Sequence, residues 1–92
     1  MASEYVNATL QSASATDIDA LGFTAANLAK ADRLFICPMD GDITYRTDGT
    51  DPPGTFGLVI QNGVTTEFTR NFAGAAFIGR TANVVVTVEI EY

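Results

Sequence analysis

The sequence predicts an all-β domain, an antiparallel β-sandwich or barrel of about seven or eight short strands. Short segments of alternating apolar and polar residues recur along the chain, and turn signals rich in Gly, Asp, Asn and Pro separate them. No strand–helix–strand alternation is present. With 92 residues, 47% hydrophobic and 17% charged, the chain is expected to form a single domain over residues 1–92.

The first strand is expected over Glu4–Gln11. One of its faces is apolar and the other polar, as a half-buried strand requires. The apolar residues are Val6, Ala8 and Leu10. Residues 1–4 are expected to form a flexible N-terminal tail.

Residues 12–31 are expected to be irregular or partly helical. Thr16 can cap a single turn over Asp17–Leu21, which Gly22 would end. The stretch Phe23–Ala31 suits a short helix through its alanines, and extended chain is the alternative.

A strand over Arg33–Cys37 is expected to end at Pro38. Along this strand, Phe35 lies opposite in phase to Leu34 and Ile36. We therefore expect one of the two faces to be covered by a neighbouring subunit and not by the core of this chain.

The loop over Asp48–Thr55 follows the next strand and is rich in Asp, Gly and Pro. Asp48 and Gly49 are expected to form a tight turn, in which the Asp side chain accepts a backbone N–H and Gly49 adopts positive φ. Asp51 belongs to the same string, and Pro52 and Pro53 are expected to hold the next residues extended.

The remaining strands have similar patterns. They are expected over Asp42–Thr47, Phe56–Ile60, Val64–Arg70, Ala75–Gly79 and Asn83–Tyr92. Asn62-Gly63 is a strong hairpin signal, so the strands on either side of it are expected to pair. The last strand is the clearest, because one face is wholly apolar; that face carries Val84, Val86, Val88 and Ile90.

The net charge of −6 repels nucleic acid and anionic lipid, so no nucleic-acid or membrane partner is expected. A basic protein surface is the better electrostatic partner. No apolar run is long enough to span a bilayer, and the first residues lack the basic start and apolar stretch of a signal peptide. The protein is therefore expected to be made and retained in the cytoplasm.

Nothing in the sequence is typical of a catalytic site, so we expect no enzymatic activity and no cofactor. Cys37 lies in an apolar run and is expected to be a small buried hydrophobe, since the chain has no histidine to activate it. Asp40 with Asp42, or Asp48 with Asp51, offer oxygen ligands for calcium. Neither string continues to the glutamate of an EF-hand, and Asp-Gly pairs are common in turns, so no metal site is expected.

The segment ADRLFICPMDGDITYRTDGTDPPGTFG resembles a recurring pattern in small structural proteins of tailed bacteriophages. The pattern has an Ala-x-Arg strand, an Arg before an Asp-Gly-Thr-x-Pro turn, and a strand that begins with Gly. These are Ala31 and Arg33, Arg46, Asp48 to Pro52, and Gly57. The resemblance extends over residues 31–92, and Pro53 departs from the small hydroxyl residue typical of that position.

The resemblance implies a β-sandwich or jelly-roll fold, with extended chain over Phe23–Ala31. It also implies a capsid decoration, or cement, protein that lies on the capsid surface of a virion assembled in the host cytoplasm. Such a protein is typically a homotrimer that bridges copies of the major capsid protein. In such a trimer the apolar face of the last strand is expected to be buried. The residues expected at interfaces are Ala2, Ser3, Glu4, Tyr5, Phe35 and Tyr92.

Three other functions remain open. A phage tail or head-to-tail component would share the same features. A carbohydrate-binding β-sandwich module would need exposed aromatic residues on one face, although the chain has no tryptophan. A small hydrolase is the least favoured, since a domain of this size has little room for a deep cleft between two carboxylates.

Overall fold

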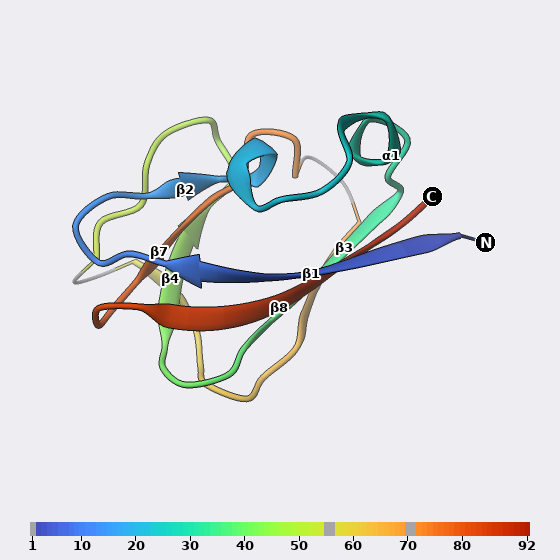
Figure 1. Cartoon of the computed structure of the whole chain (residues 1–92). Coiled ribbons are helices and arrows are strands. Elements are labelled where there is room, and N and C mark those ends of the chain that lie inside the picture. The colour runs from blue at the N-terminus through green and yellow to red at the C-terminus, as the bar shows by residue number, and fades with distance from the viewer. Residues whose placement is uncertain (1, 55–56, 70–71) are drawn as a thin grey trace.

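A computed structural model describes residues 2–54, 57–69 and 72–92 (Figure 1). In these residues the chain forms eight strands, one short α-helix and one 3-10 helix. They are β1 (Ser3–Leu10), β2 (Thr16–Asp17), η1 (Ile18–Ala20), α1 (Ala25–Ala29), β3 (Arg33–Pro38), β4 (Ile43–Arg46), β5 (Leu58–Ile60), β6 (Thr66–Phe68), β7 (Ala76–Gly79) and β8 (Val84–Glu91). All of the strand pairs are antiparallel, so the predicted all-β antiparallel class is confirmed.

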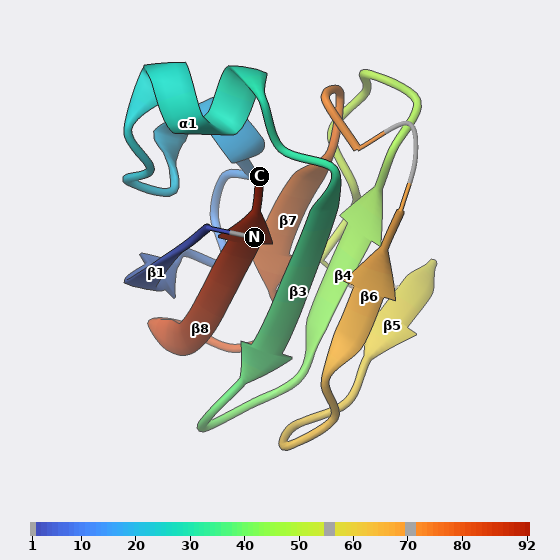
Figure 2. The ribbon, with the colours of Figure 1, turned by 90° about the vertical axis from the view of Figure 1, so that its right-hand side faces the viewer.

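The strands form two four-stranded sheets (Figure 2). The first sheet has the order β1-β8-β3-β6, and the second has the order β2-β7-β4-β5. Four of the pairs are nested in sequence, which means that each pair encloses the next one along the chain. They are β1 with β8, β2 with β7, β3 with β6, and β4 with β5. The chain is thus folded back on itself about the β4–β5 loop. The pairs β3–β8 and β4–β7 then join the nested pairs into sheets.

The hydrophobic core lies between the two sheets and draws side chains from both. The predicted apolar face of β8 is confirmed, because its four residues are at most 1% exposed. They are Val84, Val86, Val88 and Ile90. These four side chains pack in the core of this chain. The expectation that this face is buried in a trimer is therefore wrong.

The predicted hairpin at Asn62-Gly63 is also wrong, although a turn forms there. Gly63 has φ of 81°, and the Val64 N–H donates to the Gln61 carbonyl at 3.0 Å. The flanking strands belong to different sheets, since β5 pairs with β4 and β6 pairs with β3. A turn signal predicts a local reversal, but the nested pairing sends the two strands to different partners.

The N-terminus is more ordered than the flexible tail predicted for residues 1–4. Ser3 and Glu4 are the first residues of β1 and are opposite Glu91 and Ile90 of β8. Ala2 exchanges two backbone hydrogen bonds with Tyr92, at 3.0 and 2.9 Å. Strand β8 is long enough to pair with the whole of β1, so the tail prediction is wrong for residues 2–4, and residue 1 lies outside the described part.

Residues 12–31 hold β2 and both helices. The expected cap at Thr16 is wrong, because Thr16 belongs to β2 and η1 begins without a side-chain cap. Gly22 follows with φ of 115°. Between the alternatives left open for Phe23–Ala31, the structure has the helix α1, whose Leu28 packs against the core.

Two predicted strands are shorter than expected in the described part of the chain. Strand β5 begins at Leu58, and the predicted first residue, Phe56, lies outside the described residues. Strand β6 ends at Phe68, and the predicted last residue, Arg70, also lies outside them.

Candidate functional site

The β4–β5 loop carries most of the residues on which the phage resemblance rests. The Asp48 carboxylate accepts the Thr50 N–H at 3.1 Å and the Thr50 hydroxyl at 2.6 Å on one oxygen. Its other oxygen accepts from Arg46 Nη2 at 2.5 Å. The Thr50 hydroxyl, followed by Arg46, holds the pKa of Asp48 well below its ordinary value. Gly49 lies at the turn with φ of 86°. The Asp48 carboxylate thus has its hydrogen-bond partners within its own loop and strand.

This loop covers the outer face of the second sheet over its middle strands, β4 and β7. The Thr44 side chain points outward from β4 yet is fully buried, and its hydroxyl donates to the Pro53 carbonyl at 2.6 Å. Pro52 in the same loop is buried, and Asp51 is exposed. Ile78, on the same outer face, is only 6% exposed. The motif string thus contributes packing of the chain against itself.

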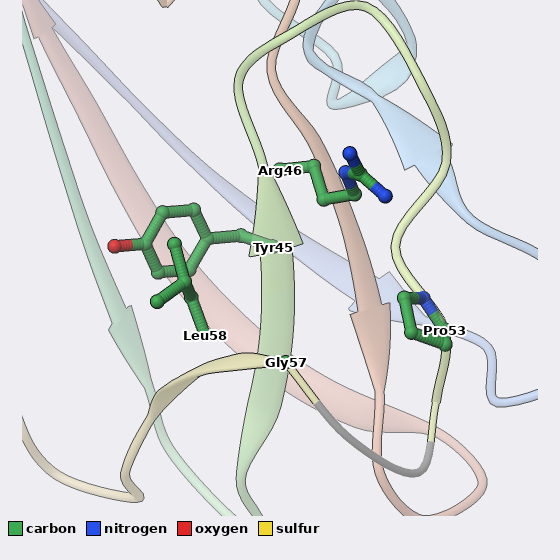
Figure 3. Close-up of a pocket in the computed structure, with 5 residues that line it drawn as sticks. All are labelled: Tyr45, Arg46, Pro53, Gly57 and Leu58. Carbon is green, nitrogen blue, oxygen red and sulfur yellow. The ribbon is translucent and has the colours of Figure 1, made fainter.

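A pocket of about 280 Å³ opens where the β4–β5 loop meets the paired strands β4 and β5 (Figure 3). Its described lining residues are Tyr45, Arg46, Pro53, Gly57 and Leu58. The Tyr45 ring lies beside Leu58, and Arg46 projects from the other side of β4 toward Pro53. Because Arg46 is already paired with Asp48, the described lining offers apolar contact and no nucleophile or free carboxylate.

The outer face of the first sheet differs from this, and we call it the open face. Its side chains follow from the register of four strands. They include Tyr5 and Asn7 of β1, Thr87 and Glu89 of β8, Phe35 and Cys37 of β3, and Glu67 of β6. Glu89 is opposite Tyr5 on one side and Phe35 on the other, and Phe35 is in turn opposite Glu67. Tyr5 is 66% exposed, and Phe35 and Glu89 are half-buried.

A hollow of about 190 Å³ lies on the open face. It is lined by Tyr5, Phe35, Ile36, Cys37, Thr65, Thr87 and Glu89. The hollow exists because the row of Thr87 and Cys37 has small side chains, whereas the neighbouring row has two aromatic rings. The prediction that Cys37 is buried is wrong: it is half-buried on this outer face, and the core residues of β3 are its neighbours in sequence.

The Tyr5 hydroxyl interacts with Glu89, the residue opposite it on β8. Its hydrogen bond to the Glu89 carboxylate, with the negative charges of Glu89 and Glu91, raises the pKa of Tyr5. The Thr87 hydroxyl in the next row donates to Asn7 Oδ1 at 2.9 Å. The hollow is therefore edged by a negative group on one side and by satisfied neutral groups on the other.

The structure brings Tyr5 and Phe35 together, on either side of Glu89. Ala2 and Tyr92 are paired at the same end of the first sheet, beside Ser3. Sequence reasoning missed Glu89 and Thr87 as members of this site. Their position on the polar side of the last strand was visible, but their neighbours depend on which strands flank β8.

Glu4 does not belong to the open face. Its carboxylate accepts the Thr24 N–H at 3.1 and 3.2 Å, the Thr24 hydroxyl at 3.1 Å and Asn27 Nδ2 at 3.0 Å. The bond from Asn27, followed by the backbone and hydroxyl of Thr24, lowers the pKa of Glu4 against a smaller effect of burial. Glu4 thus fastens the start of α1 to β1, and its place at an interface stays a prediction.

The candidate calcium ligands hold turns. Asp40 Oδ1 accepts the Val85 N–H at 2.7 Å, and Asp42 Oδ1 accepts the Asn62 N–H at 2.8 Å. Over residues 2–54, 57–69 and 72–92, no three His, Cys, Asp or Glu side chains are grouped closely enough to hold a metal ion.

Comparison with known proteins finds no matching family model, no similar curated protein and no similar solved structure. Neither helix in the described part of the chain has the length and apolar character to cross a membrane.

Proposed function

We propose that this chain is a capsid decoration protein, a virion structural protein with a jelly-roll-like β-sandwich fold. The order of the strands supports the fold. Nested pairing of eight antiparallel strands into the orders β1-β8-β3-β6 and β2-β7-β4-β5 is the arrangement expected for a jelly roll. Domains of viral capsids use this architecture, and the phage resemblance of residues 31–92 points in the same direction.

The observation that carries the proposal is the open face. On the second sheet, Thr44 of β4 and Ile78 of β7 point outward and are covered by this chain, whereas Tyr5 and Phe35 project from the first sheet around a half-buried carboxylate. Aromatic side chains are enriched at the centre of protein–protein interfaces, where they dominate the binding energy. A protein that decorates a capsid needs such a contact surface, and this role requires no catalytic residue.

The charge favours a basic partner surface. The net charge is −6, and the open face carries Glu67 and Glu89 close to its aromatic residues. We propose that the partner is the major capsid protein at the capsid surface. A homotrimer would present three open faces to neighbouring capsid subunits, and this multiplies weak contacts into strong attachment.

The test uses purified protein and heads of the phage that encodes it. Light scattering should give three times the 9.7 kDa mass of one chain. The protein should sediment with heads and raise the temperature at which they rupture. Phe35→Ala on the open face should weaken sedimentation, whereas Leu58→Ala in the pocket of the second sheet should not. A monomer that neither binds heads nor protects them would contradict the proposal, and binding to tails alone would favour a tail component.

A further inference from the structure

We infer that the hollow on the open face is a receptor for one basic side chain, lysine or arginine, of the partner protein. This inference rests on the proposed function, since it names the chemistry by which the open face would recognise a capsid subunit. It is argued from the walls of the hollow, its carboxylate and the charge around it.

The walls suit a cation. Tyr5 and Phe35 lie in the same cross-strand row with Glu89 between them, and both line the hollow. A lysine or arginine over an aromatic face is attracted by the ring quadrupole, and the attraction grows when the contact excludes water. The apolar stem of the same side chain can lie over the small residues Cys37 and Thr65 while its charge reaches the carboxylate.

The carboxylate is placed to complete such a contact. Glu89 is half-buried, so its charge is partly shielded from water, and charge pairs are stronger there than on a fully exposed surface. The interaction with the Tyr5 hydroxyl uses at most one acceptor site of Glu89. A carboxylate can accept about four hydrogen bonds, so acceptor capacity remains for an ammonium or a guanidinium.

The surrounding charge favours a cation over an anion. Among the residues that the structure describes, Glu67, Glu89 and Glu91 project from the open face, against one guanidinium, that of Arg33. Arg33 forms ion pairs with two other glutamates of this face. Its guanidinium nitrogens lie 3.7 Å from a Glu67 carboxylate oxygen and 4.0 Å from a Glu91 carboxylate oxygen. Three carboxylates against one guanidinium leave an excess of two negative charges.

A bound metal ion is a poorer occupant. Calcium takes about six to eight oxygen ligands, whereas the hollow offers a single carboxylate among its described lining residues. A flexible basic side chain needs only one anion and an apolar or aromatic surface, and the hollow supplies both.

The test is a titration of the isotope-labelled full chain, followed by amide chemical shifts. The probes are three nonapeptides that alternate Gly with Arg, with Lys, or with neutral citrulline. The Arg and Lys peptides should shift the amides of Tyr5, Phe35 and Glu89, and the citrulline peptide should bind at least about tenfold more weakly, since it lacks the charge.

Two matched variants locate the interaction. Glu89→Gln should weaken binding of the Arg peptide by about tenfold. Glu67→Gln removes an equal charge from the same face but from outside the hollow, and it should change binding by less than about twofold, as exposed charges do. Phe35→Leu keeps an apolar side chain without a ring and should weaken binding as well. Melting curves of the three variants should match wild type, which separates binding from folding.

Equal effects of Glu89→Gln and Glu67→Gln, shifts spread over acidic residues elsewhere, or no shifts would overturn the inference. Sedimentation with heads separates this failure from that of the proposed function. If wild type and Glu89→Gln bind heads equally, the hollow is not the contact but decoration stands. If the peptides bind in the hollow and heads do not, the receptor stands and decoration falls.

Discussion

The outer faces of the two sheets are built in opposite ways. On the second sheet, Thr44 and Ile78 point away from the core and are still buried, because the β4–β5 loop folds back over them. On the first sheet, Phe35 and Glu89 also point outward, yet they remain half-exposed. The same chain thus covers the two middle strands of one sheet on both sides and leaves an aromatic and acidic surface on the other sheet.

Loop lengths account for the difference. The β4–β5 connection spans residues 47–57 at the tip of the nested pairing, and it is long enough to return across its own sheet. The connections next to the centre of the first sheet, residues 39–42 and 80–83, are short turns. The helix α1 is fastened to β1 at the end of that sheet through Glu4. In the described part of the chain, these connections therefore leave the open face uncovered.

The largest expected effect separates a core phenylalanine from one on the open face. Phe77 is fully buried on β7, so Phe77→Ala should lower the free energy of unfolding by about 3–5 kcal/mol. Phe35→Ala removes a half-buried ring and should lower it by less than about 1.5 kcal/mol. Urea unfolding followed by circular dichroism measures both values. Comparable losses would mean that Phe35 belongs to the core; if Phe77→Ala does not fold, Phe77→Leu should still lose more than Phe35→Ala.

The next effect compares the buried hydroxyl of Thr44 on the second sheet with the hydroxyl of Thr87 on the open face. Thr44→Val keeps the shape but leaves the Pro53 carbonyl without its buried donor, which should cost about 1–3 kcal/mol. Thr87→Val removes the hydroxyl that donates to Asn7 on the open face. Water can replace that bond, so the loss should stay within about 0.5 kcal/mol. Thermal unfolding of both variants measures the loss of stability. Equal losses would show that the β4–β5 loop does not exclude water from Thr44.

Much of the fold was predictable from local patterns. The alternation of β1 and β8 identifies their buried faces, since a strand with one apolar face has only one way to lie on a core. The Asp48-Gly49 string shows the expected side-chain bond and positive φ, because an Asx turn depends on residues two apart. These features require nothing from distant parts of the chain.

Sheet order and the candidate site depend on distant pairing, which local patterns do not show. Asn62-Gly63 forms its turn, but nothing near it reveals that β5 and β6 join different sheets. Tyr5 and Phe35 were each expected at an interface. That Glu89 lies between them follows only from the register of β8 with β1 and β3.

A smaller effect tests the loop that makes the two faces different. Gly49 has φ of 86° and open space where a side chain would be, so Gly49→Val should cost about 1–2 kcal/mol through backbone strain alone. Gly54 lies in the same loop without positive φ, and its nearest neighbours would be in ordinary contact with an added Cβ. Gly54→Ala should therefore cost little, or even stabilise the fold. Differential scanning calorimetry measures both, and an unchanged melting temperature for Gly49→Val would contradict the turn.

The smallest expected effect depends on pH and concerns the edge of the first sheet. The hydrogen bonds from Asn27 and Thr24 lower the pKa of Glu4, so folding favours the ionised carboxylate. Its contribution is complete above the ordinary pKa of 4.5 and disappears as the pH falls through the lowered value of the folded state. Glu4→Gln should therefore be less stable than wild type near neutral pH, and the difference should shrink at about pH 3. Glu67→Gln on the open face is the control, since its 3.7 Å contact with Arg33 is exposed. Urea midpoints at several pH values measure the effect, and a Glu4→Gln difference that stays constant would show that its carboxylate charge does not hold α1.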